Sequence, residues 1–513
     1  MSRQTRKRTR IAVLLAVAGA VAVTAGVAQA GVRHHATKRA SLAQLEQRVG
    51  WESYWYSLYN LSALSMGKSG MGIQFTAPKA KLMAVLKAAG LSKPPLTNPY
   101  FVSVPYSSGD PHFMRAWNAN DGATWRWNPK SFDTTITPQS YAWTATKYSE
   151  WAKNFENHTA PSSLDHFRGL MLNNLAATAA GWMEQNLRLP NGLFASAWKN
   201  GHVTDATPKL RDQLAVLIAL GSLETVADPA DHFAWYTAPL PVTRVRGMED
   251  HLFTALRRSA LVKSPSFADR ALGVEALSWY ASTTRDAAAR TQAASLALTW
   301  AKGLRASQST RGAVTAAGLT PLDAQALFVR AEGQASLVAA AVKQSGEAKA
   351  AHAAAVTAWN YLNSHYWDAK AGLYLPAPGR TTQSYAAGLV ADLTGALNVA
   401  QHVLHAKGAA GRYAVFFVHA VDHSRLLASQ LPFTAGQHNG LPLPPKAGGT
   451  YGIAPVFLSS VAYDTANGSW KVTNGRFTTA AALELSDEMF WMGAWAGQQV
   501  KGRPALGLPY LHG

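Results

Sequence analysis

Apolar residues recur every three or four positions through most of the chain, which is the spacing of one helix face. Serine N-caps precede one such face, which is formed by Leu164, Phe167, Met171, Leu175 and Trp182. Another helix is predicted to begin with Thr320 as N-cap and Pro321 at the first helical position. The same spacing predicts further helices at 208–226, 247–262, 266–284, 286–305, 348–365, 383–406, 411–430 and 478–499.

Strand patterns are few. Two alternating runs around an Asn-Gly turn predict one β-hairpin near residues 455–473. A chain of about ten helices joined by short turns is typical of an all-α domain made of helical hairpins. We therefore expect an (α/α) toroid or a helical-hairpin array.

Two loops are alike in sequence, "NLRLPNGLFASAW" and "HYWDAKAGLYLPAP". Each has a helix end, a polar turn, a glycine, a leucine and an aromatic residue in that order. Gly192 and Gly372 are 180 positions apart, which fits three helical hairpins of about 60 residues each. Ordinary glycine C-caps explain the glycines but not the Leu-aromatic pair that follows.

The first 30 residues have the pattern of a secretory signal peptide, because five basic residues precede an apolar run that ends in "AQA". Cleavage after Ala30 predicts a secreted, periplasmic or cell-envelope protein. A membrane contact is expected only if this segment stays uncleaved. Residues 31–140, rich in aromatic and proline residues, are expected to pack as an N-terminal extension on a toroid domain at residues 141–513.

The chain has no cysteine, so no disulfide supports the exported protein. Loss of the five basic residues of the signal segment lowers the formal net charge from +19 to +14. This excess favours an anionic polymer or an anionic envelope surface as partner, although a solvated basic surface without a ligand explains it too. The basic residues are scattered and form no nucleic-acid motif, so nucleic acid is not expected as a partner.

Two acid pairs stand directly before aromatic helical runs. Glu249 and Asp250 precede Phe253, and Asp487 and Glu488 precede Phe490. Acids in a first helical turn complement the helix dipole, which is one explanation. Paired carboxyls for catalysis are the other, because adjacent carboxylates repel and one of them keeps a proton near neutral pH.

Together with the Gly-Leu-aromatic loops, "EDHLFTAL" resembles the six-hairpin (α/α)6 toroid glycosidases, in particular the Asp-Asp helix start of their α-mannanase-like members. Glu249 stands where that pattern has Asp. The resemblance implies a ring of inner helices whose leading ends face a groove, with first-turn acids aimed at a sugar. Glycoside cleavage needs two carboxyls about 5 to 9.5 Å apart. We therefore expect one catalytic carboxyl from Glu249 or Asp250, and the other from Asp487 or Glu488.

Aromatic residues in polar surroundings indicate a sugar-binding groove. "AWNANDGATWRWNPKSFD" sets three tryptophans among amides and charges, a combination that holds pyranose rings by stacking and hydrogen bonds. Packing of these tryptophans at the edge of the toroid is the structural alternative. The expected substrate-binding residues are Trp117, Asp121, Trp125, Trp127, Trp198, His251 and Trp491.

Four histidines form a second candidate site. His402, His405, His419 and His423 are spaced three and four apart on two predicted helices, which suits metal or haem ligation. Solvated or core histidines are the alternative. Phosphate-binding loops, serine-hydrolase elbows and zincin motifs are missing from the sequence, and no cofactor is expected.

Three functions follow from these patterns. The first is an exported carbohydrate-active enzyme, a glycoside hydrolase or polysaccharide lyase, that acts on a glycan in an aromatic-lined groove. The second is a non-catalytic envelope protein that binds a glycan or peptide in the same groove. The third is an extracytoplasmic metal- or haem-binding protein built on the histidines.

Overall fold

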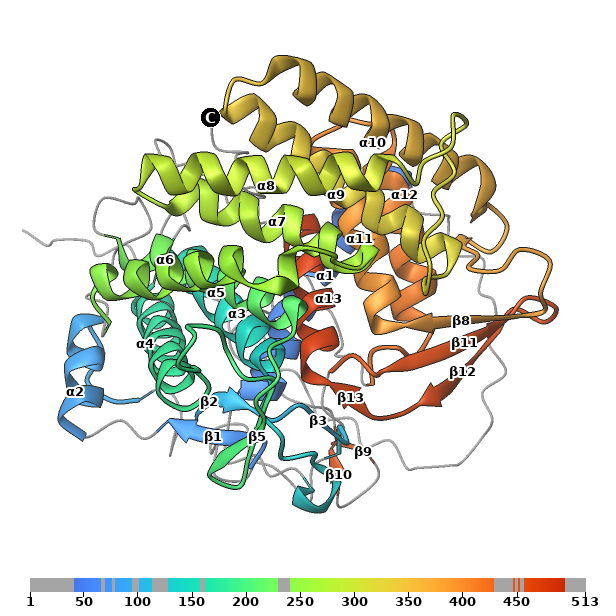
Figure 1. Ribbon diagram of the computed structural model, residues 1–513. Coiled ribbons are helices and arrows are strands. Elements are labelled where there is room, and N and C mark those ends of the chain that lie inside the picture. The colour runs from blue at the N-terminus through green and yellow to red at the C-terminus, as the bar shows by residue number, and fades with distance from the viewer. Residues whose placement is uncertain are drawn as a thin grey trace, which may run out of the picture. The chain divides into compact units, whose positions relative to one another are not determined.

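The computed structural model describes residues 41–65, 70–75, 79–94, 101–112, 128–156, 162–228, 240–428, 446–447, 451–452 and 456–493. Helices dominate these ranges (Figure 1), which confirms the all-α class. The α-helices are α1 Leu42–Ser65, α2 Lys79–Ala88, α3 Pro138–Glu156, α4 Ser163–Asn186, α5 Leu210–Ala227, α6 Val242–Arg258, α7 Phe267–Thr283, α8 Ala287–Arg305, α9 Pro321–Ala341, α10 Ser345–His365, α11 Ala387–His402, α12 Ala409–Phe417 and α13 Thr479–Met492. Within this part of the chain, no helix is both long and apolar enough to span a bilayer.

Six helices form a closed inner ring. Around this ring, α3 packs against α5, α5 against α7, α7 against α9, and α9 against α11. The ring closes because α11 packs against α13 and α13 packs against α3. The inner helices α5, α7, α9 and α11 are buried along most of their length. A helix that is apolar on nearly all sides is stable only inside such a double layer.

Six further helices form the outer layer. Helices α4, α6, α8, α10 and α12 each pack on the inner helix that precedes them, and α1 packs on α13. Figure 1 shows one such pair, α7 and α8, lying alongside each other. The N-terminal helix α1 thus supplies the outer partner of the last inner helix, and the architecture is an (α/α)6 toroid.

The turns from outer to inner helices repeat one local structure. The loops after α4, α8 and α10 each pair two short extended stretches, Arg188 with Phe194, Gln308 with Val314 and Trp367 with Tyr374. Gly192 and Gly372 adopt positive φ angles of 85° and 67°, which other residues rarely take. Gly312 occupies the equivalent place, 120 positions after Gly192 and 60 before Gly372, so the hairpin period is about 60 residues.

The predicted hairpin is present as β11 (Ser460–Asp464) paired antiparallel with β12 (Ser469–Asn474). Strand β11 also pairs with β8 (Thr382–Ala386), which gives a three-stranded sheet. The sequence predicts helix from residue 383, but alternating burial against β11 makes residues 383–386 part of a strand. The remaining short strands are β1 Gly72–Phe75, β2 Phe101–Pro105, β3 Ser108–Gly109, β4 Ala197–Lys199, β5 His202–Asp205, β6 Trp367–Asp368, β7 Leu373–Tyr374, β9 Lys446–Ala447, β10 Tyr451–Gly452 and β13 Phe477–Thr478.

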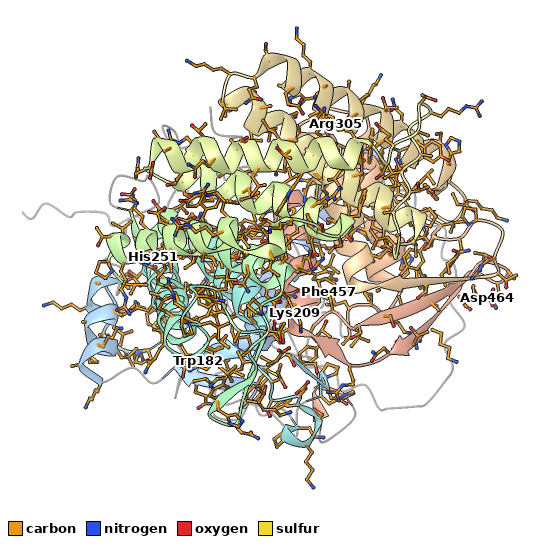
Figure 2. All side chains as sticks on the ribbon, viewed as in Figure 1. Trp182, Lys209, His251, Arg305, Phe457 and Asp464 are labelled. Atoms are coloured by element: carbon orange, nitrogen blue, oxygen red, sulfur yellow. The ribbon has the colours of Figure 1, made fainter. Side chains whose placement is uncertain are left out.

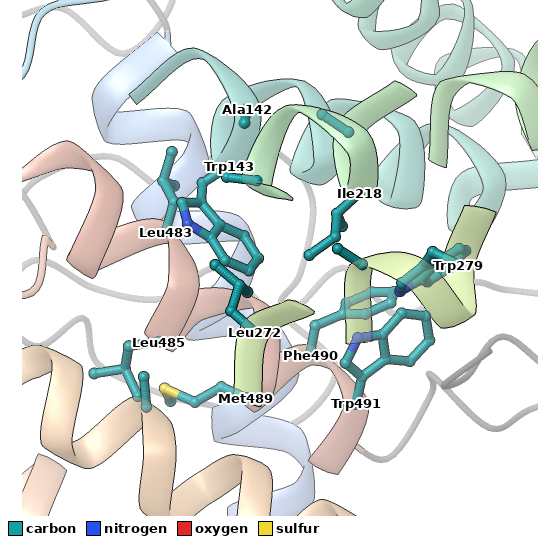
Figure 3. Packing of buried hydrophobic residues seen from close by; sticks show 14 of the residues in the cluster. Ala142, Trp143, Ile218, Leu272, Trp279, Leu483, Leu485, Met489, Phe490 and Trp491 are labelled. Carbon is teal, nitrogen blue, oxygen red and sulfur yellow. The ribbon is translucent and has the colours of Figure 1, made fainter. Parts of the chain in front are cut away.

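The main hydrophobic core extends through both layers and across the inner ring. Figure 3 shows side chains from α3, α5, α7 and α13 gathered in one place, among them Trp143, Leu272 and Leu483. Each of these three side chains is buried. The centre of the ring is therefore packed, and a charged side chain placed there has little water around it.

Candidate active site

Charged side chains from all six inner helices meet inside this packed centre. We call them the central charge cluster, which consists of Lys147 and Glu150 from α3, Arg211 from α5, Glu275 from α7, Arg330 from α9, Asp392 from α11, and Glu484, Asp487 and Glu488 from α13. Six carboxyl groups face three cationic groups. Such a concentration of buried charge in an apolar core is costly unless the groups are paired or neutralised.

Arg330 links four of the carboxyl groups. Its Nη2 lies 3.2 Å from Glu275 Oε2 and also donates to Glu488 Oε1. Its Nη1 lies 2.9 Å from Asp392 Oδ1 and 4.0 Å from Glu484 Oε1. The planar guanidinium presents its donors in a fixed fork, so it fixes the positions of these carboxyls relative to one another.

Lys147 organises the other side of the cluster. Its Nζ donates to Glu150 Oε2 at 2.9 Å and to Asp487 Oδ1 at 3.2 Å, and the Lys147 side chain is wholly buried. The same nitrogen lies 4.4 Å from the centre of the Phe490 ring. The ammonium thus joins the first inner helix to the last one.

Burial leaves protons on part of the cluster near neutral pH. It raises the pKa of Glu488 to about 8, with Arg330 opposing the shift and Glu275 adding to it. It raises the pKa of Asp392 to about 7, again against Arg330. Burial also raises the pKa of Glu275, where Arg330 opposes the shift and Asp487 and Glu484 add to it. Carboxyls that titrate close to neutral pH suit general acid and base catalysis.

A narrow pocket reaches the cluster. Its polar lining consists of Arg211, Glu275, Arg330 and Glu484, and Leu272 and Leu327 are among its apolar lining. The space that the centre of a water molecule can occupy there is about 10 Å³, which is room for about one water. Arg211 is the second residue of α5 and is partly exposed, so it places the pocket towards the end of the ring where inner helices begin.

The structure separates the two predicted acid pairs. Asp487 and Glu488 belong to the central charge cluster. Glu249 and Asp250 lie on the outer helix α6, where Glu249 accepts from Thr283 at 3.1 Å and Asp250 accepts from Tyr280 at 2.6 Å. Both partners are on α7 and neither belongs to the cluster.

The expectation that these acids occupy first helical turns is wrong for both pairs. Helix α6 begins at Val242 and α13 at Thr479, several residues before the acids, and neither first turn holds an acid. Glu249 instead faces Glu224 of α5, and burial together with that neighbour raises the pKa of Glu249 well above its usual range. Arg246 Nε donates to Glu224 Oε1 at 2.6 Å. These contacts fit an inter-helix carboxyl pair that shares a proton.

The predicted substrate-binding residues are dispersed. Trp198 lies on β4 with its ring edge against Trp182, at a centroid distance of 5.1 Å. Trp491 is buried beside Phe490 at 4.9 Å, and His251 is exposed on α6. The predictions for Trp117, Asp121, Trp125 and Trp127 lie outside the described residues.

The four histidines do not form a metal site. His419 and His423 lie 5.5 Å apart by ring centroid, on a π-helical turn (Val418–Asp422) and the residue that follows it. His402 ends α11 and interacts with the backbone of Trp491, and His405 follows in a left-handed conformation. Across the described ranges, no three His, Cys, Asp or Glu side chains are close enough to hold a metal ion.

Sequence reasoning missed most of the central charge cluster. The available signal was a charged residue in a helix that is apolar on all sides, as with Arg330 in "ALFVRAEGQASLV", Asp392 in "AGLVADLTGAL" and Glu275 in "ALGVEALSWY". Such a helix is buried, so its charges must be buried and paired as well. Lys147 and Glu150 were missed because α3 itself was not predicted.

No protein-family model matches the sequence. No curated protein matches it either. Among solved structures, D-mannose isomerase superposes with a TM-score of 0.50 and 10% identity over 82% of this chain and 99% of that one. A sugar epimerase from a ruminal bacterium gives 0.48 and 9% over 80% and 98%. The cellulase Cel9M of C. cellulolyticum gives 0.45 and 10% over 88% and 98%. At such low identity the first of these likenesses shows the fold alone, and it agrees with the toroid architecture seen in the helices.

Proposed function

We propose that this chain is a carbohydrate-acting enzyme, specifically a glycoside hydrolase, whose catalytic groups are Glu275 and Glu484. The observation that carries the proposal is the convergence of Glu275 and Glu484, from two separate inner helices, on one pocket, together with burial that raises the pKa of Glu275. The fold supports it, because D-mannose isomerase, which by its name acts on a sugar, has the same architecture.

The two carboxyls that line the pocket differ in their surroundings. Glu275 has a raised pKa because it is buried, so it suits the general acid that protonates the leaving glycosidic oxygen. Glu484 lies 3.6 Å from Arg211 and 4.0 Å from Arg330, so it suits the base. In hydrolysis, the bond from the anomeric carbon to the leaving oxygen breaks, and a water adds its oxygen to that carbon. Glu484 takes the proton of this water.

Asp487 and Glu488 enter this proposal as positioning residues. Glu488 accepts from Asn398 Nδ2 at 2.6 Å and from Arg330, so it holds the arginine that both pocket carboxyls contact. Asp487 holds Lys147 in the same way. Within the described residues, no hydrogen bond or ion pair links Glu249 or Asp250 to the pocket, so they have no catalytic role in this proposal.

The test is release of reducing ends from a panel of neutral and acidic polysaccharides. Glu275→Gln and Glu484→Gln should each lower turnover by about a thousandfold or more, because each removes a proton-transfer group. Glu347→Gln, a carboxyl on the outer helix α10, is the matched control and should retain activity. Full activity in both pocket variants, or no cleavage of any polysaccharide by the unmodified chain, would contradict the hydrolase assignment.

A further inference from the structure

A groove of about 450 Å³ lies between the loop that follows α4 and the second half of α6. Its lining includes Arg188, Asn191 and Gly192 from the loop and His251, Ala255 and Arg258 from the helix. Figure 2 labels His251 at this helix. The volume is within the range of sites that bind small molecules or single units of a polymer.

The groove forms where a small residue, Ala255, occupies a contact between loop and helix that recurs in the later repeats. In this loop Gly192 faces Ala255, and a Cβ on Gly192 would lie 3.0 Å from the Ala255 Cβ. In the later repeats the equivalent glycines face larger groups. Gly312 faces the backbone and side chain of Thr357, and Gly372 faces the His419 ring. In those repeats the larger groups fill the space between the loop and the helix. Here the smaller Ala255 leaves that space open as a groove.

The charged side chains that line the groove are all of one sign. None of the ten residues that line it, all of them described, is acidic, whereas two arginines and a histidine are among them. Arg258 and His251 are exposed. Arg188 pairs with Glu184 one helical turn earlier, which orients its guanidinium and partly compensates its charge, so Arg258 is the arginine of the groove that has no carboxylate partner among the described residues. Asn191 is fixed as well, because its Oδ1 accepts from the Leu193 backbone at 3.0 Å.

We propose that this cationic groove binds the carboxylate of a uronic acid unit, so that the substrate of the enzyme is an acidic glycan. This inference rests on the proposed function and names its substrate class. An arginine fork pairs with a carboxylate through two parallel hydrogen bonds. The side chains of Asn191 and Thr254 supply partners for sugar hydroxyls. The formal net charge, +19 for the whole chain and +14 without residues 1–30, attracts such a polymer from a distance.

The groove and the pocket lie at the same end of the ring. The groove is built where outer helices α4 and α6 end, and the chain passes from there to the starts of inner helices α5 and α7. The pocket opens beside Arg211, at the start of α5. Because the pocket has room for only about one water, a glycan would lie over its opening beside Arg211 and extend along this end of the ring to the groove.

The experiment is affinity electrophoresis of the full chain through gels that contain polygalacturonate, with neutral hydroxyethylcellulose and single-stranded DNA in separate gels. We expect retardation by polygalacturonate that weakens with salt, because ion pairs are screened. Arg258→Gln should weaken the affinity about tenfold, the loss of one charge-assisted contact. The control is Arg257→Gln, which removes the same charge from the neighbouring exposed position outside the groove.

Equal losses in the two arginine variants would overturn the inference, because they would indicate general surface charge. Equal retardation by the neutral polymer, or stronger retardation by DNA, would overturn it as well. The proposed function fails separately. If Glu275→Gln and Glu484→Gln retain activity while Arg258→Gln still loses polygalacturonate affinity, the groove stands and the catalytic assignment falls. If only neutral glycans are bound and cleaved, the catalytic assignment stands and the groove falls.

Discussion

A buried carboxyl with one cationic partner, Glu332, shows what the interior of this protein does to charge. Its side chain is wholly buried, and Arg305 Nε lies 3.2 Å away. Burial raises the pKa of Glu332 to about 8, although Arg305 opposes the shift. The desolvation of the carboxylate therefore outweighs a direct ion pair at this position.

This raised pKa has a consequence for stability. The pKa of an exposed glutamate is about 4.3. Between that pH and about 8, Glu332 has therefore released its proton in the unfolded chain but keeps it in the folded chain. The contribution is fully present below the unfolded pKa and is lost as pH rises through the window. We expect the free energy of unfolding to fall from pH 5 to pH 8 and Glu332→Gln to make this fall shallower. Chemical denaturation across that range measures it, and an unchanged slope in the variant contradicts it.

At the scale of elements, a glutamine near the start of an inner helix holds two of the three repeated loops. Gln325 of α9 accepts from the Val314 backbone at 2.9 Å and donates to Gly312 O at 2.9 Å and Ala358 O at 2.8 Å. Gln213 of α5 makes a similar exchange, because it accepts from the Phe194 backbone N–H at 2.8 Å and donates to Phe194 O at 2.9 Å. One side chain thus pairs backbone groups that would otherwise be buried and unsatisfied.

Gln325→Ala removes three of these hydrogen bonds and leaves buried backbone groups without partners. We expect a loss of about 2–4 kcal/mol in the free energy of unfolding. Gln292→Ala, an exposed glutamine on α8, is the control and should change stability by less than about 0.5 kcal/mol. Denaturant titration of both variants measures the difference. Equal small losses would mean that water replaces the glutamine contacts.

The period of these loops was visible in the sequence only in part. Gly192-Leu-Phe and Gly372-Leu-Tyr were recognised as alike, but Gly312 is followed by Ala-Val and was not. All three loops share the backbone turn, which tolerates different side chains after the glycine. The loops of Gly192 and Gly312 share the glutamine contact as well. Prediction of the helix boundaries from the sequence has a similar limit. Helix α6 begins at Val242 after Pro241 and has no side-chain cap, so a Ser, Thr, Asp or Asn cap does not mark its start and the pattern places Glu249 in a first turn.

At the scale of the whole ring, the fold class was predictable and the candidate site was not. The period of apolar residues reports which face of each helix is buried, and that sufficed for an all-α toroid. The central charge cluster depends on which helices are neighbours around the ring, because Arg330 meets carboxyls that are 55 to 158 positions away in the chain. The sequence indicates Asp487 and Glu488 only by their adjacency, whereas their partners in the structure come from α3, α9 and α11.

Closure of the ring depends on Lys147, which binds Asp487 across the contact between the first and last inner helices. Lys147→Met keeps the apolar stem but leaves Glu150 and Asp487 buried without their cation. Breaking a buried ion pair from one side costs about 3–5 kcal/mol. Because burial already raises the pKa of Glu150 well above its usual range, protonation at low pH should relieve part of this cost.

We therefore expect a large loss of thermal stability for Lys147→Met at pH 8 and a smaller loss at pH 5, measured by calorimetry at both values. Lys349→Met, on the exposed face of α10, removes the same charge and should change little at either pH. Adding Asp487→Asn to Lys147→Met removes one uncompensated carboxylate and should recover part of the stability at pH 8. A loss that is the same at both pH values would show that Lys147 acts through packing on Phe490 and not through its charge.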